Sequence, residues 1–293
     1  MHGTSAIAGG EGAADRHAAV VFSSDAEWAD HLVTFVRTGF DRGEQVQYFA
    51  DSTDPGRVHR TLADRGIDAA SAVRRGQLVV TTAGQTYLSG ARFDPDMVIG
   101  LWHEAVESAT AGGYRGLRAI GEMSWGGRDM AGADRLLEYE LRIHHEVFAQ
   151  LPLCAWCFYD RRLVPRADLE VLAAAHLARA GAADRHDHAD GPGLRAAPLA
   201  GRPGFRLSGS AGYENRYVTA SALAALTASP AEHVTLDLSA LDHLDVAALA
   251  GIARAARRRS AATPVRLLGA PPALRRMLEL FPELGGVMEV TGR

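Results

Sequence analysis

Two apolar segments of the chain end in carboxylate and aromatic side chains that could bind a small molecule. Glu122 and Trp125 follow one such segment, and Tyr159 and Asp160 end another. Both segments are expected to be strands of a parallel sheet, in which ligands bind beyond the carboxyl ends of the strands. Because small apolar ligands are held by aromatic walls with a few convergent polar groups, these four are candidate ligand-binding residues. The alternative is structural: Glu122 would pair with an arginine and the aromatic rings would belong to the core.

A C-x-x-C motif, the spacing of redox and zinc sites, occurs at Cys154 and Cys157. Both cysteines lie in a predicted strand. Residues three apart on a strand are separated by about 10 Å and face opposite sides of the sheet, which is beyond the reach of a disulfide. We therefore expect two buried thiols, one on each side of the sheet.

Neither of two histidine groups has the spacing of a metal site. His144, His145 and Glu146 do not form the H-E-x-x-H motif, and neighbouring helical residues do not share a face. His186 and His188 lie among Asp, Gly and Pro residues; they could bind a metal loosely, but such a segment is more typical of a solvated chain. We expect no metal, no cofactor and no catalytic residues.

All 31 basic residues are arginine, so the chain has no P-loop lysine and no Schiff-base lysine. A G-x-x-x-x-G-K-[ST] phosphate-binding motif is also missing from the sequence. We therefore do not expect an enzyme. Two alternatives stay open: a degenerate RecA-type nucleotide-binding enzyme that uses Glu122 to activate water, and a ligand-free protein-interaction scaffold.

The composition is that of an ordinary globular protein. The 293 residues are 47% hydrophobic and 23% charged, and the net charge of −4 does not point to nucleic acid or an anionic membrane surface. No apolar run approaches the roughly 20 residues of a transmembrane helix, and the N-terminus lacks the pattern of a secretory signal. Two cysteines cannot form a disulfide framework. We expect a cytoplasmic protein.

Strands and helices are predicted to alternate through the first part of the chain. Buried strands are expected at 17–22, 46–51, 78–81, 117–123 and 153–159, and helices at 25–41, 55–66, from 94 onwards, at 132–149 and at 169–180. This alternation is typical of a parallel sheet covered by helices, so the expected fold class is α/β.

The length and the composition predict two domains. Residues 1–16 are rich in Gly and Ala and are expected to be a disordered tail. The first domain covers 17–180, and residues 181–203 form a flexible linker by their Gly, Pro and Ala content. A smaller α/β domain covers 204–293.

The clearest local pattern of the second domain is a strand followed by a capped helix. Alternating apolar residues predict a strand from Val234, the strand contains a D-L-S motif, and Asp245 is placed to cap the helix that follows. This order resembles a STAS domain, the module of anti-sigma factor antagonists, in which a kinase phosphorylates the second serine of D-S-S-G-L. The corresponding run here is Asp245-Val-Ala-Ala-Leu249, so Val246 and Ala247 replace both serines and offer no hydroxyl.

The STAS resemblance implies a fold and a class of partner. The partner would be an anti-sigma factor or a serine-kinase-type regulator, bound without the usual phosphorylation switch. Asp245, Val246 and Ala247 would then form the partner-binding remnant of the phosphorylation site. Alternatively, the domain only forms homo-oligomers.

Short blocks of the first domain also occur in a characteristic order. These are His17, Trp102-His-Glu, Leu117-Arg-Ala-Ile-Gly-Glu-Met-Ser-Trp125, Tyr139-Glu140 and Cys157-Phe-Tyr-Asp160. Together they resemble the MEDS sensory domain, the methanogen/methylotroph type found in a dichloromethane-responsive regulator, over roughly residues 17–176. The resemblance implies a RecA/KaiC-like fold that has become a sensor of small organic molecules. It adds His17, Trp102 and Tyr139 to the candidate ligand-binding residues.

Overall fold

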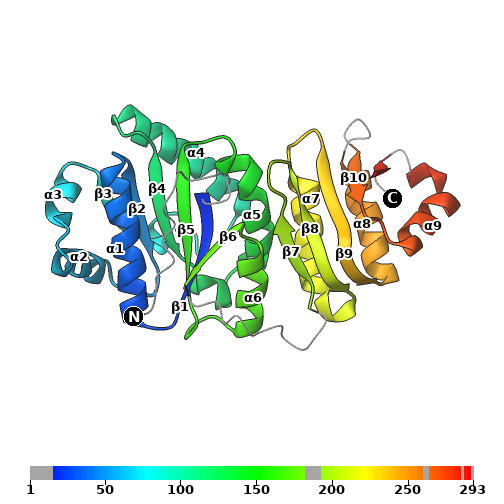
Figure 1. Cartoon of the computed structure of the whole chain (residues 1–293), viewed down its shortest axis with the longest axis horizontal. Coiled ribbons are helices and arrows are strands. Elements are labelled where there is room, and N and C mark those ends of the chain that lie inside the picture. The colour runs from blue at the N-terminus through cyan, green and yellow to red at the C-terminus, as the bar shows by residue number, and fades with distance from the viewer. Residues whose placement is uncertain (1–15, 182–192, 260–263, 285–286, 292–293) are drawn as a thin grey trace.

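The computed structural model describes residues 16–181, 193–259, 264–284 and 287–291, which form two sheets flanked by helices (Figure 1). The α/β class and the arrangement in two domains are confirmed: the first domain contains a six-stranded sheet and the second a five-stranded sheet. The predicted tail up to residue 15 and the histidines His186 and His188 lie outside the described residues.

The first sheet is parallel throughout. Its strands are β1 (His17–Phe22), β2 (Gln45–Ala50), β3 (Leu78–Thr82), β4 (Leu117–Glu122), β5 (Leu153–Asp160) and β6 (Ala178–Gly181). They are hydrogen-bonded in the order β3-β2-β4-β5-β1-β6, so β1 lies between β5 and β6. The helices of this domain are α1 (Asp25–Asp41), α2 (Pro55–Asp64), α3 (Ala69–Arg74), α4 (Pro95–Ala111), α5 (Leu136–Ile143) and α6 (Arg166–Ala174).

Different helices cover the two faces of this sheet. Val20 and Phe158 belong to the core under α1, α2 and α3, whereas Ala19 belongs to the core under α4, α5 and α6. Because successive strand residues face opposite sides, Cys154 lies in the first core and Cys157 in the second. The prediction of two buried thiols on opposite faces is confirmed.

Three helices begin where local sequence signals place them. Ser24 caps α1 by accepting a hydrogen bond from the backbone N–H of Glu27. Asp54 and Asp94 cap α2 and α4, and each is followed by a proline in the first turn. Across the described part of the chain, every helix is too short or too polar to cross a membrane.

The predicted helix over 169–180 is wrong in its second half. Helix α6 ends at Ala174, and β6 begins at Ala178 beside β1. The parallel pairing with β1 provides hydrogen bonds to backbone groups that the predicted helix would have bonded within itself.

The predicted helix over 132–149 is also divided, because α5 ends at Ile143 and a π-helical turn, His144–Phe148, follows it. Helix α3 had no sequence prediction.

The second sheet is mixed. Its strands are β7 (Arg195–Pro198), β8 (Gly204–Ala211), β9 (Val234–Leu244), β10 (Val265–Leu268) and β11 (Met288–Thr291). The order is β11-β10-β9-β8-β7, in which only the β7–β8 pair is antiparallel. Its helices are α7 (Arg216–Ala228), α8 (Val246–Arg258) and α9 (Pro272–Leu280).

Strand β7 corrects the sequence prediction of a flexible linker over 181–203. Residues 195–198 pair with β8, and Leu194 and Ala196 are buried. The linker prediction was therefore wrong for this part: burial of these apolar side chains offsets the Gly and Pro content on which the prediction rested.

Helices α5 and α6 lie between the two sheets (Figure 1). Helix α5 contacts α7 of the second domain, and the Ser221 hydroxyl of α7 lies 3.4 Å from the Asp134 backbone carbonyl just before α5. One cluster of buried apolar residues runs from the α4–α6 side of the first sheet into the core of the second domain. This places every residue of α5 in a buried position.

Candidate functional site

An apolar cavity lies on the side of the first sheet that α4 and α5 cover. Its volume is ≈30 Å³. Aromatic side chains dominate its wall, and four of the seven sequence-predicted ligand residues line it: His17, Trp102, Trp125 and Tyr139. Residues 17, 102, 125 and 139 come from β1, α4, the turn after β4 and α5, so only the folded chain assembles this wall.

Two indole groups give the cavity its polar features. Trp102 Nε1 donates to the Tyr139 hydroxyl at 2.7 Å, which ties α4 to α5. Trp125 is fully buried, and among the described residues its Nε1 makes no hydrogen bond of normal geometry; the Tyr87 hydroxyl is its polar neighbour. A buried N–H with a poorly placed acceptor is only partly satisfied, so the cavity wall offers this donor to an incoming molecule.

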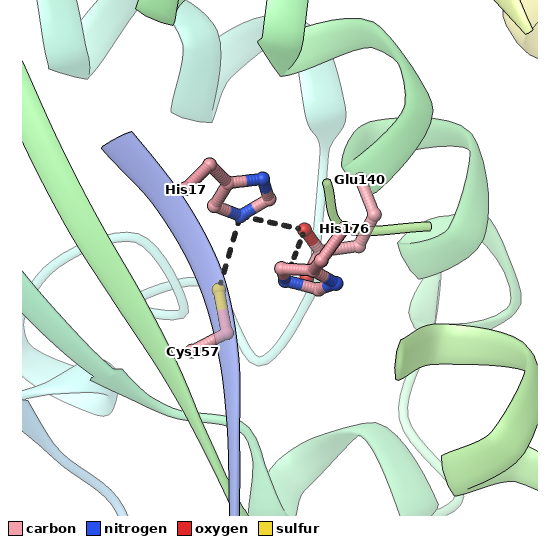
Figure 2. Close-up of side chains that lie close together, drawn as sticks. All are labelled: His17, Glu140, Cys157 and His176. Atoms are coloured by element: carbon pink, nitrogen blue, oxygen red, sulfur yellow. Dashed lines mark hydrogen bonds and ion pairs between the residues drawn. The ribbon is translucent and has the colours of Figure 1, made fainter. Parts of the chain in front are cut away.

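A cluster of four buried polar side chains adjoins this cavity. His17, Glu140, Cys157 and His176 point toward one another (Figure 2), and one donor atom from each lies within 4.8 Å of all the others. His17 Nε2 lies 3.4 Å from Cys157 Sγ and 3.3 Å from Glu140 Oε2. His176 Nε2 lies 3.5 Å from the same Glu140 oxygen.

Burial sets the protonation of this cluster. Burial lowers the pKa of His17 to about 3, and burial together with the neighbouring His17 lowers that of His176 to about 3. Burial also raises the pKa of the Glu140 carboxyl and of the Cys157 thiol. Every one of these shifts favours the neutral form of its group, as expected for polar groups removed from water.

The cluster joins segments that are distant in the sequence. His17 and Cys157 are neighbours across the β1–β5 pair, with side chains on the α4–α6 side of the sheet. Glu140 projects from α5, and His176 lies between α6 and β6. Cys157 was expected only as a core thiol, and His176 was missed because it lay inside a predicted helix. A lone histidine in an apolar run was the available signal, since a buried imidazole needs a polar partner.

The other three predicted ligand residues do not line the cavity. Tyr159 instead contacts the buried polar cluster, where its hydroxyl donates to Glu140 Oε1 at 3.1 Å. Asp160 accepts hydrogen bonds from the Arg162 guanidinium at the end of β5. The Glu122 side chain points to the face of the sheet that α1–α3 cover, as Ile120 does, because alternate residues of a strand face the same side.

Glu122 is a structural anchor. One carboxylate oxygen accepts from the Tyr48 hydroxyl at 2.5 Å, and the other accepts from the backbone N–H groups of Asp51, Ser52 and Thr53 at 2.7–2.9 Å. These bonds fix the loop after β2. The carboxylate is therefore engaged on both oxygens, and the partners differ from the arginine that the structural alternative assumed.

The start of α8 has the geometry that the STAS resemblance implies. Asp245 caps the helix by accepting from the Ala248 N–H at 2.7 Å. Val246 is 82% exposed and Ala247 is also exposed, although both are apolar. The adjoining turn after β8 presents Tyr213, which is 69% exposed. An apolar surface therefore lies at the start of α8.

Comparison with protein families agrees with both resemblances. Residues 200–282 match the family described as Mlab, STAS domain, and STAS domains typically interact with anti-sigma factors or kinases. No curated protein matches the chain. Residues 16–177 match the family described as MEDS, the methanogen/methylotroph, DcmR sensory domain. Both are sensory or regulatory families, which indicates a role in signalling or regulation. Because the MEDS match covers more than half of the chain, the protein belongs to the MEDS family, with a STAS domain after its sensory domain.

Proposed function

We propose that this protein is a signalling regulator in which a small organic ligand, bound in the MEDS cavity, changes how the STAS domain engages a partner. The partner is an anti-sigma factor or a serine-kinase-type regulator. The observation that carries the proposal is the position of α5, which lines the aromatic cavity on one side and packs against α7 of the STAS domain on the other.

The cavity sets the size and polarity of the ligand. A water molecule needs about 10–15 Å³ of such space, and drug-sized ligands occupy pockets of about 300–1,000 Å³. A cavity of ≈30 Å³ therefore suits a molecule of only a few non-hydrogen atoms. The aromatic wall favours an apolar body, and the Trp125 N–H favours one hydrogen-bond acceptor or halogen atom on it.

Helix α5 provides a direct route to the STAS domain. Tyr139 lines the cavity, while Glu138, one residue earlier, lines a hollow at the domain junction together with Leu223 of α7. A helix is stiff along its length, so a shift of Tyr139 on ligand binding would also move the part of α5 that contacts α7. This route needs no phosphorylation, which agrees with the absence of a hydroxyl at residues 246 and 247.

A thermal-shift screen of the full chain tests the ligand. The probes are short alcohols, haloalkanes and carboxylic acids, and a ligand that binds only the native state at 100 times its Kd stabilises it by about 2.7 kcal/mol. We expect at least one of these classes to raise the Tm. Trp125→Phe keeps a six-membered aromatic ring but removes the five-membered ring with its N–H, so it should weaken binding of an acceptor ligand about fivefold, the equivalent of about 1 kcal/mol.

Trp28→Phe is the matched control. Trp28 is buried on the opposite side of the sheet, where its Nε1 donates to the Tyr48 hydroxyl. This variant should lower the basal Tm without changing the ligand-induced shift. Equal loss of the shift in both variants, or no shift with any probe class, would refute a ligand site in this cavity.

A further inference from the structure

We propose that His17, Glu140, Cys157 and His176 bind a divalent transition-metal ion, Zn²⁺, in a site built into the wall of the MEDS cavity. The four side chains are buried, and they converge from β1, α5, β5 and the segment between α6 and β6 (Figure 2). The sequence alone led to the opposite expectation, because Cys154 and Cys157 were expected on opposite faces of a strand and the histidine groups did not indicate a metal site.

The distances between donor atoms fit a tetrahedral site. Zinc binds thiolate sulfur at about 2.3 Å and imidazole nitrogen or carboxylate oxygen at about 2.0–2.2 Å, so neighbouring donors of a tetrahedron lie roughly 3.3–3.6 Å apart. The separations here are 3.3 Å from His17 Nε2 to Glu140 Oε2, 3.4 Å from His17 Nε2 to Cys157 Sγ, and 3.5 Å from His176 Nε2 to the same Glu140 oxygen. Three of the six separations therefore match a tetrahedron, and all six are within 4.8 Å, so a bound ion requires only small side-chain shifts.

Two of the four donor atoms have polar neighbours only inside the cluster. Glu140 Oε2 and His176 Nε2 are buried and form no hydrogen bond of normal geometry with a described residue, although the Glu140 carboxyl also lies near the Cys157 thiol. Buried polar atoms in native proteins are nearly always satisfied, so a pair of such atoms aimed at one point needs an explanation. A metal ion bound between them supplies the missing interaction for both.

The surrounding contacts hold these side chains in ligating orientation. His176 Nδ1 lies 2.9 Å from the Leu172 carbonyl, so this nitrogen donates and the Nε2 lone pair faces the cluster. His17 Nδ1 lies 3.0 Å from His144 Nε2, which also lies 3.2 Å from the Ala175 carbonyl; His17 Nε2 is free to bind a metal in the tautomer in which the His17 proton is on Nδ1 and the His144 proton is on its own Nδ1. The Tyr159 hydroxyl donates to the second Glu140 oxygen at 3.1 Å. Metal-ligating imidazoles and carboxylates usually have such outer partners.

The donor set favours zinc over the abundant hard cations. Imidazole and thiolate are borderline or soft ligands, whereas Mg²⁺ and Ca²⁺ prefer an all-oxygen set. Four protein ligands fill a tetrahedral zinc ion, which is the pattern of a structural site. The ion would lock α5, through Glu140, onto β1 and β5. This goes beyond the proposed ligand sensing and does not depend on it, because metal binding is measured without any organic ligand.

The test uses the full chain freed of metal by a chelator. On titration with Co²⁺, a zinc substitute with visible spectra, we expect the intense visible bands of a tetrahedral ion and a thiolate-to-cobalt charge-transfer band at one equivalent. Added Zn²⁺ should abolish both. A folded wild-type protein, judged by circular dichroism, that shows neither band would overturn the proposal.

The two cysteines give a matched pair of variants. Cys157→Ser should remove the charge-transfer band, whereas Cys154→Ser, on the opposite face of the same strand, should keep it. His176→Ala and Glu140→Gln should each weaken Co²⁺ binding by at least about tenfold. Binding that survives unchanged in a folded Cys157→Ser, His176→Ala double variant would place the ion elsewhere, for example on surface histidines, and would refute this site.

Discussion

At the scale of single residues, Glu122 illustrates a carboxylate whose role is structural. It accepts from the Tyr48 hydroxyl and from the backbone N–H groups of residues 51–53. Hydrogen bonds to a charged group contribute about 1.5–3 kcal/mol each, and their loss leaves buried donors unsatisfied. The strand-end position that marked Glu122 as a candidate ligand residue is real, but its side chain has the parity of the other face.

Glu122→Ala should therefore destabilise the protein without weakening ligand binding. We expect the free energy of unfolding to fall by about 3 kcal/mol, because several donors lose their acceptor together. Urea denaturation measures this loss. Glu289→Ala is the control, since the exposed Glu289–Arg266 pair should contribute no more than about 0.5 kcal/mol. An intact stability with a lost thermal-shift response would instead return Glu122 to the binding site.

At the scale of elements, α5 is held by a buried network of charges. Arg142 forms ion pairs with Glu138 and Glu146, one helical turn before and after it, and with Asp96 of α4. The Arg142 guanidinium stays charged, because these carboxylates raise its pKa against the opposing effect of burial. The network fixes α5 in register with α4, which the proposed coupling between cavity and STAS domain requires.

Removing the centre of this network should be costly. Arg142→Met leaves Glu138 and Glu146 buried without their shared partner, so we expect the free energy of unfolding to fall by about 3 kcal/mol. Arg276→Met breaks an exposed pair with Glu279 on α9 and should change it by less than about 0.5 kcal/mol. Chemical denaturation compares the two. Similar small losses would mean that the α5 network does not hold the helix.

Helix α8 carries the second prediction at this scale. The exposed start of the helix presents Val246 and Ala247 without a hydroxyl. Incubation with purified anti-sigma factor kinases and ATP should therefore leave residues 245–249 unmodified, and complex formation should not depend on ATP hydrolysis. A phosphate would add about −1.5 to −2 charges to this apolar surface and weaken docking through desolvation and repulsion.

Ala247→Ser tests whether only the hydroxyl is missing. With a kinase that docks on the wild-type protein, this variant should gain phosphate at residue 247, detected by mass spectrometry, and then bind the kinase more weakly. Ser239→Ala is the control, since the Ser239 hydroxyl donates to Asp237 at 2.6 Å and lies outside the switch position. A variant at 247 that binds the kinase well yet is never modified would contradict the proposal.

At the scale of the whole molecule, the two domains share one apolar core through α5 and α7. The sequence predicts a flexible linker over 181–203, of which residues 195–198 form β7, and the low hydrophobicity of the remainder favours cleavage there. Limited proteolysis should cut first in this segment, and the two fragments should still elute together on size-exclusion chromatography, because burial of the α5–α7 contact stabilises their association. Fragments that separate without denaturant would show that the domains do not share a core, and a first cut within 204–291 would contradict the linker prediction.

The sequence by itself determined the features that depend on near neighbours in the chain. Local signals predicted helix starts near Ser24, Pro55 and Asp94 and the Asp245 cap of α8, and alternating apolar residues predicted the strand from Val234. Each signal acts within a few residues, so it could be read without the fold. The short blocks around His17 and Trp125 also sufficed to recognise the MEDS family.

Only the tertiary structure decided which of these residues meet. β6 forms because its backbone can hydrogen-bond to β1 as a parallel strand. No local pattern of residues distinguishes Ala178–Gly181 from the end of a helix. His17 and Cys157 are 140 residues apart in the chain yet lie side by side across the β1–β5 pair. Strand parity sent Glu122 to one face and the cavity residues to the other. Such contacts depend on the order of the strands and on the face to which each side chain points. Both are fixed by which apolar side chains are buried in the whole fold, so no single segment of the sequence determines them.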